Sequence, residues 1–97
     1  MAIGVITEVD QGTLEQYDLV NEKIAAGPPA DGLVFHMAAV KEDGGFRIVE
    51  VWESEEQHQR FEQQSVGPAV SEVVGPDTTP SHREIFEVHN LMVAGQG

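Results

Sequence analysis

The fold is best predicted from one stretch in which a strand pattern runs directly into a helix start. The stretch reads Phe46-Arg47-Ile48-Val49-Glu50-Val51-Trp52-Glu53-Ser54. β-Branched and aromatic residues dominate positions 46–53, which predicts a strand. Ser54 and Gln57 have the spacing of a capping box, in which each side chain satisfies a free backbone donor of the other residue. A helix is therefore expected to begin here.

That helix is expected to run to about Gln64 or Val66. Gly67-Pro68 should then break it, because proline has no backbone N–H to continue the hydrogen-bond ladder, and Pro68 can restart a short helical piece that ends at Val74. Helical spacing puts four residues on the inward stripe of this region: His58, Phe61, Ser65 and Ala69.

The remaining elements follow from alternation, capping and turn residues on either side of this stretch. Strands are predicted over residues 2–9, 32–40 and 82–89, with a hairpin turn over 42–45. A further helix is capped by Thr13 and Gln16 and runs to about Ala26. Its inward stripe consists of Leu14, Tyr17, Val20, Ile24 and Ala25, with Asn21 inside the stripe and Leu19 on the opposite side.

The order strand, helix, strand, strand, helix, strand predicts an α+β fold, the ferredoxin-like βαββαβ arrangement with a four-stranded antiparallel sheet. The 97 residues suffice for one domain, with a core at about 2–92 and a mobile C-terminal tail. Two helices on one face leave the other face of the sheet bare. The strand over 32–40 is apolar on both faces, so this bare face predicts a partner, and a second copy related by a two-fold axis is the simplest one.

The composition excludes several classes of function. The chain has no cysteine, so disulfides and cysteine-ligated metal centres are excluded. Its net charge of −12 disfavours nucleic acid and anionic membrane surfaces as partners. No apolar run approaches the roughly 20 residues that span a bilayer. Residues 1–6 lack the basic flank and the cleavage site of a signal peptide. We therefore expect a cytoplasmic protein.

The element order, the Val-Trp-Glu-Ser stretch over 51–54, Phe35-His36 and the ending Val88-His89-Asn90 resemble the dimeric α+β barrel superfamily. The likeness covers about residues 2–92 and is closest to small bacterial members of the antibiotic-biosynthesis-monooxygenase-like group. It implies a homodimer in which two sheets face each other and close a barrel. It also implies one pocket per protomer, between the sheet and its own two helices. The function stays open, because one scaffold hosts several chemistries.

The resemblance can be compared, position by position, with known activities of the superfamily. Haem-degrading members have a Trp on the second helix and a His ten residues later, where this chain has Phe61 and Ser71. Ser71 does not ligate haem iron as that His does, so haem degradation is disfavoured. Olivetolic acid cyclase has a Tyr and a His that fall on Phe61 and near Gly67, so its catalytic pair is missing. Cofactor-independent quinone-forming monooxygenases have looser patterns, which this sequence neither fits nor excludes.

Two histidines are the candidate catalytic groups. His58 lies on the inward stripe of the second helix, where related proteins carry a large apolar residue. It is either an acid or base of the pocket near neutral pH or a histidine at the edge of a thin core. His36 sits in the middle of an apolar strand, where it is either a base or a structural or dimer-interface residue.

The face that His36 occupies depends on the register of the hairpin, since a slip of one residue moves every side chain to the other face. A four-residue loop over 42–45 places His36 opposite Val51. A shift of one residue places it opposite Glu50, on the face of Trp52. Pairing with Glu50 would orient His36 as a base, whereas Glu50 is otherwise one half of a salt link with an arginine on a neighbouring strand.

The predicted ligand pocket consists of Tyr17, Asn21, Glu50, Trp52, Phe61 and Ser65. Asn21 and Tyr17 are polar anchors, although Asn21 can equally tie down a strand end and Tyr17 can send its hydroxyl to water. Trp52 and Phe61 are walls, and Trp52 is alternatively a core or interface residue. The sequence has no metal-ligand spacing, no nucleophile elbow and no phosphate-binding glycine loop, so no metal and no cofactor are expected.

Two functions are consistent with these residues. The first is a small-molecule-binding protein that acts as a cofactor-independent enzyme of the monooxygenase, cyclase or isomerase type, with histidine as the acid or base. The acidic surface repels anions, which favours a small apolar or aromatic substrate. The second is a noncatalytic ligand-binding or stress-related structural dimer. An apolar cavity that holds His58 or His36 beside an Asn or Glu favours the first, and histidines in solvent or in the dimer seam favour the second.

Overall fold

A computed structural model of the chain describes residues 1–10, 12–42, 44–75 and 82–94. The predicted turn residues Gln11 and Asp43, the predicted loop residues 76–80 and the tail residues 95–97 lie outside the described residues. In chain order the described elements are β1 (Ile3–Val9), α1 (Leu14–Ala25), β2 (Leu33–Val40), β3 (Phe46–Trp52), α2 (Glu55–Phe61), η1 (Glu62–Val66), α3 (Gly67–Val73) and β4 (His82–Glu87). This order confirms the predicted ferredoxin-like α+β class.

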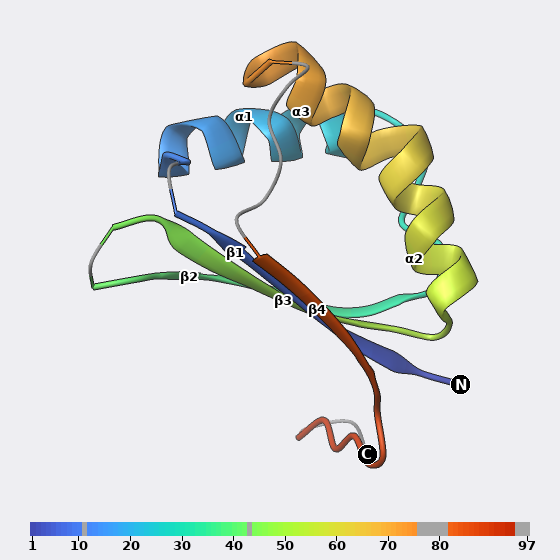
Figure 1. Ribbon diagram of the computed structural model, residues 1–97. Helices are drawn as coiled ribbons and strands as arrows, with labels where there is room; N and C mark the ends of the chain where they lie inside the picture. Colours follow the sequence, from blue (N-terminus) through green and yellow to red (C-terminus); the bar gives the residue numbers. More distant parts are fainter. Residues whose placement is uncertain (11, 43, 76–81, 95–97) are drawn as a thin grey trace.

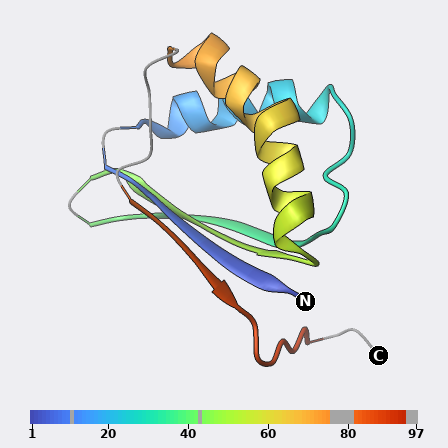
Figure 2. The same cartoon turned by 45° about the vertical axis from the view of Figure 1, so that its right-hand side comes forward.

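The strands form one antiparallel sheet in the order β2-β3-β1-β4. All helical segments cover the same face of this sheet (Figure 1), and the turned view in Figure 2 shows the same two layers. Residues 88–94, which follow β4, lie on the opposite side of the sheet from the helices (Figure 1). The molecule thus has one covered face and one open face.

The predicted helix break at Gly67-Pro68 is wrong, because α2, η1 and α3 follow one another without an interruption. Gly67 keeps right-handed helical angles, and its N–H donates to the carbonyl of Glu62, five residues earlier. This wider π-helical turn leads directly into α3, where Pro68 occupies the first turn and needs no backbone donor.

The predicted capping boxes are complete at α1 and altered at α2. At α1, Thr13 Oγ1 accepts from the Gln16 N–H at 3.1 Å, and Gln16 Oε1 accepts from the Thr13 N–H at 3.2 Å. At α2, Ser54 Oγ accepts from the Gln57 N–H at 3.2 Å, but the Gln57 side chain bonds to the Ser54 hydroxyl. Both helices therefore begin where the sequence predicts.

The tightly packed core lies at one end of the covered face. It consists of Ile3, Val5 and Trp52, with Ala30, Leu33 and Phe61 packed against them. In contrast, α1 has no buried residue, and it packs mainly along η1 and α3. Leu14, 47% exposed, and Ala25 were expected to face inward, and both are exposed instead. Leu19 is exposed as predicted.

The open face carries an apolar strip that the strand pairings align across the sheet: Ile6, Phe35, Met37, Val49, Val51 and Phe86. Phe35, Met37 and Phe86 are each more than 40% exposed. The Phe86 ring lies against Gly4, where a Cβ would collide with it. Coverage of β2 on both faces, which its sequence predicts, is not provided within one chain, because the helices cover one face of the sheet and most residues of β2 are exposed.

Candidate functional site

The hairpin register places His36 on the covered face of the sheet. The last paired residues are Val40 and Phe46, so the loop runs from Lys41 to Gly45, one residue longer than the 42–45 turn. Gly45 takes a positive φ of 76°, and its carbonyl accepts from the Lys41 N–H at 3.2 Å. His36 consequently pairs with Glu50, which is the second of the two predicted registers.

Four side chains from α1, β2 and β3 form a continuous hydrogen-bonded chain. The Tyr17 hydroxyl lies 2.5 Å from His36 Nε2, and His36 Nδ1 lies 2.6 Å from Glu50 Oε2. The Trp52 indole N–H donates to the other oxygen, Glu50 Oε1, at 3.0 Å. The Tyr17 and His36 rings are nearly parallel, with an interplanar angle of 17°. We call this set the Tyr17–His36–Glu50–Trp52 chain.

Glu50 is an ionised acceptor at neutral pH. Burial of its side chain, 16% exposed, opposes the charge, but the hydrogen bonds from His36 and Trp52 and the nearby imidazoles outweigh this effect. The pKa of the Glu50 carboxyl is therefore held below its ordinary value of 4.5. An ionised carboxylate only accepts hydrogen bonds, so His36 Nδ1 must carry the proton of their shared bond.

This assignment fixes the remaining hydrogen bond when His36 is neutral. A neutral imidazole has a proton on one nitrogen and a lone pair on the other. With the proton on Nδ1, His36 Nε2 accepts from the Tyr17 hydroxyl. The expectation that Tyr17 sends its hydroxyl to water is therefore wrong, and so is the salt link of Glu50 with a strand arginine, because its partners are His36 and Trp52.

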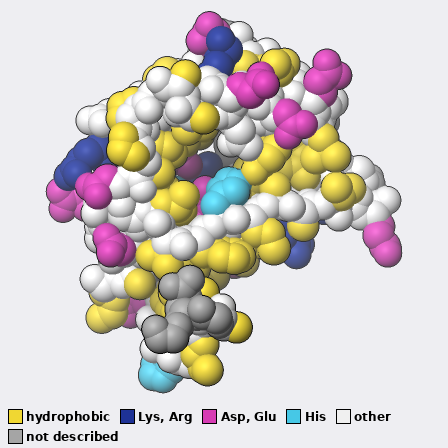
Figure 3. All heavy atoms as spheres, turned by 180° about the vertical axis from the view of Figure 1, so that it is seen from behind, with side chains coloured by type: hydrophobic (Ala, Val, Ile, Leu, Met, Phe, Trp, Pro, Cys, Tyr) yellow, Lys and Arg dark blue, Asp and Glu magenta, His cyan; other side chains and the backbone are white. Residues whose placement is uncertain are grey.

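The chain lies along a cleft between the helices and the sheet. Figure 3 shows the molecule hollowed there, with a histidine side chain at the edge of the hollow. The His36 side chain is 31% exposed, and Tyr17, Asn21 and Ser65 are partly buried. Water or a small molecule can therefore reach the Tyr17 end of the hydrogen-bonded chain.

Trp52 is placed differently from a pocket wall, whereas Phe61 is partly exposed. Trp52 is 1% exposed and belongs to the core, which is one of the alternatives that the sequence leaves open for it. The Phe61 ring lies 5.5 Å from the Trp52 ring, centroid to centroid. Trp52 thus acts behind the cleft, where it holds Glu50, and has no free surface for a ligand.

His58 is buried beside this core. It is 2% exposed, and its ring lies 5.5 Å from the Trp52 ring. Within the described part of the chain, neither of its ring nitrogens has a hydrogen-bond partner. Glu62 Oε1 lies 3.3 Å from Nε2, outside hydrogen-bond geometry. The two predicted catalytic histidines are therefore not equivalent, and only His36 is open to the cleft.

Sequence reasoning missed a second polar link, which joins β4 to the helical layer. Arg83 Nη2 lies 3.1 Å from Glu62 Oε1, and Arg83 Nε donates to Thr7 Oγ1 at 3.2 Å. The alternation of β4 could have placed Arg83 on the covered face, but nothing in the sequence indicates which helical residue it meets. Among residues 1–10, 12–42, 44–75 and 82–94, no group of three His, Asp or Glu side chains could hold a metal ion.

Comparison with known proteins supports the fold. No family model and no curated protein sequence matches the chain. Solved structures do match. One of them, from Chloroflexus aurantiacus, is described as an antibiotic biosynthesis monooxygenase. It gives a TM-score of 0.63 at 19% identity, and the match covers 100% of this chain and 98% of that one.

Two Streptomyces oxygenases have similar structures. A mutant of SnoaB, a cofactor-independent oxygenase from Streptomyces nogalater, gives a TM-score of 0.63 at 14% identity, covering 94% of this chain and 95% of its own. The monooxygenase ActVA-Orf6 of Streptomyces coelicolor, in complex with nanaomycin D, gives a TM-score of 0.57 at 19% identity. That match covers 95% of this chain and 90% of ActVA-Orf6. The chain thus has the α+β fold of antibiotic-biosynthesis-monooxygenase-like proteins, and the resemblance seen in the sequence is confirmed for the fold. No helix in the described part of the chain is long and apolar enough to cross a membrane.

Proposed function

We propose that the protein binds a small, neutral, apolar or aromatic compound in the cleft and acts on it as a cofactor-independent acid/base enzyme, with His36 as the base. The observation that carries this proposal is the Tyr17–His36–Glu50–Trp52 chain. Glu50 holds His36 in one tautomer and can stabilise the imidazolium that forms when His36 takes up a proton. Trp52 holds Glu50 in turn.

The charge of the molecule supports a neutral substrate. The net charge of −12 makes the approach of an anion unfavourable, whereas it does not hinder an uncharged aromatic compound. The names of two structural neighbours agree with this class, since one is a cofactor-independent oxygenase and the other binds nanaomycin D. Monooxygenation, cyclisation and isomerisation by such an enzyme can all begin with removal of a proton from the substrate.

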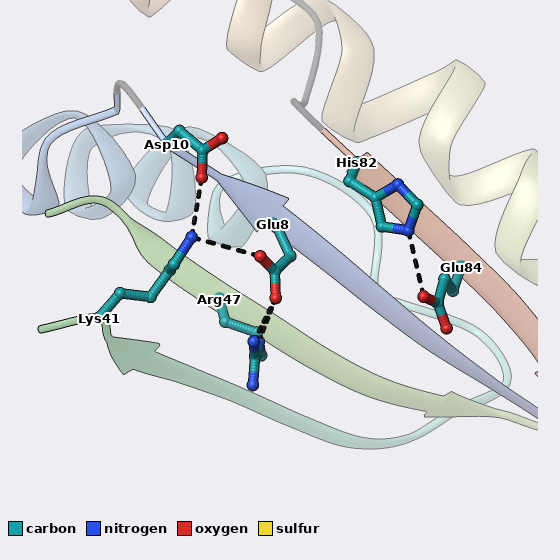
Figure 4. Close-up of polar contacts among 6 residues, drawn as sticks. All are labelled: Glu8, Asp10, Lys41, Arg47, His82 and Glu84. Carbon is teal, nitrogen blue, oxygen red and sulfur yellow. Dashed lines mark hydrogen bonds and ion pairs between the residues drawn. The ribbon is translucent and has the colours of Figure 1, made fainter. Parts of the chain in front are cut away.

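We further propose that the protein is a homodimer that covers the open face of the sheet. The exposed apolar strip around Phe35, Met37 and Phe86 is the main support. An ionic cluster borders it: Lys41 bridges Asp10 and Glu8, and Arg47 pairs with Glu8 (Figure 4). Arg47 and Lys41 hold the pKa of Glu8 below its usual range.

Binding and proton removal can be tested together. Trp52 is the single tryptophan and contacts Glu50, so its fluorescence should report a ligand that perturbs the chain. We expect nanaomycin D and 2-tetralone, a neutral bicyclic ketone, to change this fluorescence saturably. We also expect the protein to speed deuterium uptake from D₂O into the benzylic CH₂ of 2-tetralone, followed by NMR.

The matched control is His82→Gln, because His82 lies outside the cleft and bonds locally to Glu84 (Figure 4). It should bind and exchange as the unchanged protein does. Saturable binding without deuterium uptake would favour the competing proposal, a noncatalytic ligand-binding or stress-related dimer. No binding of either compound would contradict the proposed enzyme and leave the stress-related structural dimer.

The dimer is tested by the mass in solution at micromolar concentration. We expect about twice the 10.6 kDa of one chain. Met37→Glu places a charge in the apolar strip and should give the single-chain mass, whereas Glu84→Gln, on the same face, should not. A monomeric mass for the unchanged protein would contradict the dimer.

A further inference from the structure

The Tyr17–His36–Glu50–Trp52 chain leaves no imidazole nitrogen free for a substrate. Nδ1 of His36 is bonded to Glu50, and Nε2 is bonded to the Tyr17 hydroxyl. A molecule that enters the cleft can therefore reach a basic nitrogen of His36 only by displacing Glu50 or Tyr17 from it. A phenolic oxygen that donates its proton still has lone pairs, so Tyr17 can accept a hydrogen bond from a ligand at the same time.

Tyr17 is held in place for this contact. Its ring lies nearly parallel to the His36 ring, to which the hydroxyl is hydrogen-bonded, and meets the Phe46 ring edge-on, with centroids 5.4 Å apart. The hydroxyl is thus fixed by one short hydrogen bond and by the ring contact with Phe46, on a helix whose start is set by a complete capping box. A proton-transferring group needs to be held in position in this way before the substrate binds.

We propose that Tyr17 is a catalytic residue that exchanges the proton with the substrate, and that the substrate class is neutral carbon acids, in which a C–H bond lies next to a carbonyl group and an aromatic ring. This inference rests on the proposed function, because it assigns the atom through which His36 acts.

The proposed step balances without any oxidant or reductant. The substrate C–H bond breaks and its proton passes to the Tyr17 oxygen, while the proton of Tyr17 passes to His36 Nε2. The products are the enolate of the substrate and an imidazolium that is paired with the Glu50 carboxylate. Return of a proton to the same or another carbon along the reverse path regenerates the neutral chain, which gives exchange or isomerisation.

Tyr17→Phe is the direct test, because it removes the hydroxyl and keeps the ring that packs on His36 and Phe46. We expect saturable binding of 2-tetralone to persist and deuterium uptake to fall by about 10²–10⁴-fold. Uptake at the unchanged rate in Tyr17→Phe would overturn the role of Tyr17 and leave His36 as the base. No uptake with the original protein would overturn the proposed function, and the role of Tyr17 with it.

A second variant covers the case in which Tyr17→Phe fails to fold. Tyr17 is the single tyrosine of the chain, so growth on 3,5-difluorotyrosine replaces this residue alone. The two fluorine atoms make the hydroxyl more acidic and change the size of the side chain little. If Tyr17 carries the proton, the pH profile of deuterium uptake should move to lower pH, and an unmoved profile would overturn the inference.

Discussion

The two predicted catalytic histidines, His36 on β2 and His58 on α2, differ in both exposure and hydrogen bonding. His36 is 31% exposed at its side chain and has a hydrogen bond on each ring nitrogen. His58 is 2% exposed and has none within the described residues. The comparison teaches that access and partners, rather than burial in an apolar site, make a histidine useful as a base. A buried imidazole without partners destabilises the fold and cannot reach a substrate.

The largest expected effect concerns activity. His36→Gln should lower deuterium uptake into 2-tetralone by about 10²–10⁴-fold, because it removes the proton acceptor. His58→Leu should leave the rate unchanged, since its ring has no surface in the cleft. Both rates are measured by NMR on variants whose folding has been verified by circular dichroism. The opposite pattern would reverse the comparison between the two histidines.

The second effect concerns stability. His58→Leu should raise the free energy of unfolding by about 1 kcal/mol, because it replaces a buried group with two unsatisfied nitrogens by an apolar side chain of similar size. For a chain of this length that corresponds to a melting temperature about 4–8 °C higher. Thermal unfolding measures the shift. A lower melting temperature would mean that His58 makes a favourable polar contact in solution.

The smallest effect sharpens the comparison through Glu50, the hydrogen-bonded carboxylate that His36 has; the Glu62 carboxylate beside His58 lies outside hydrogen-bond geometry. Because the pKa of folded Glu50 is lowered, its ionised form stabilises the fold at pH values above its ordinary pKa of 4.5. This contribution is lost as the pH falls through the lower folded pKa. Glu50→Gln should therefore be less stable than the original protein at neutral pH, and the difference should shrink in acid. A constant difference across this range in urea unfolding would contradict the assignment.

Much of the architecture could be predicted because its signals are local. The strand from Phe46 to Trp52 and the caps at Thr13 and Ser54 depend on neighbouring residues, and the structure has them where expected. The predicted helix break at Gly67-Pro68 is wrong for a physical reason. A glycine and a proline end most helices, but one π-helical turn can carry the chain across them.

The candidate site was predicted as a set of residues but not as an arrangement. Tyr17, His36 and Glu50 are all among the predicted site residues. Whether they come together depends on the strand register, because the sequence allows His36 to lie opposite either Val51 or Glu50. The separation of His36 from His58 also escaped sequence reasoning, because both lie in apolar patterns. Only tertiary packing shows that one faces the cleft and the other faces Trp52.

The loop from Lys41 to Gly45 has a consequence for how such a protein can change over generations. Its length fixes which face of the sheet every residue of β2 occupies. Removing or adding one codon here would carry His36 to the open face and bring its neighbours Phe35 or Met37 towards the helices. A heritable change that touches no residue of the candidate site could thus separate His36 from Glu50 and Tyr17 in one step, or bring such residues together in a relative whose strand already carries the histidine.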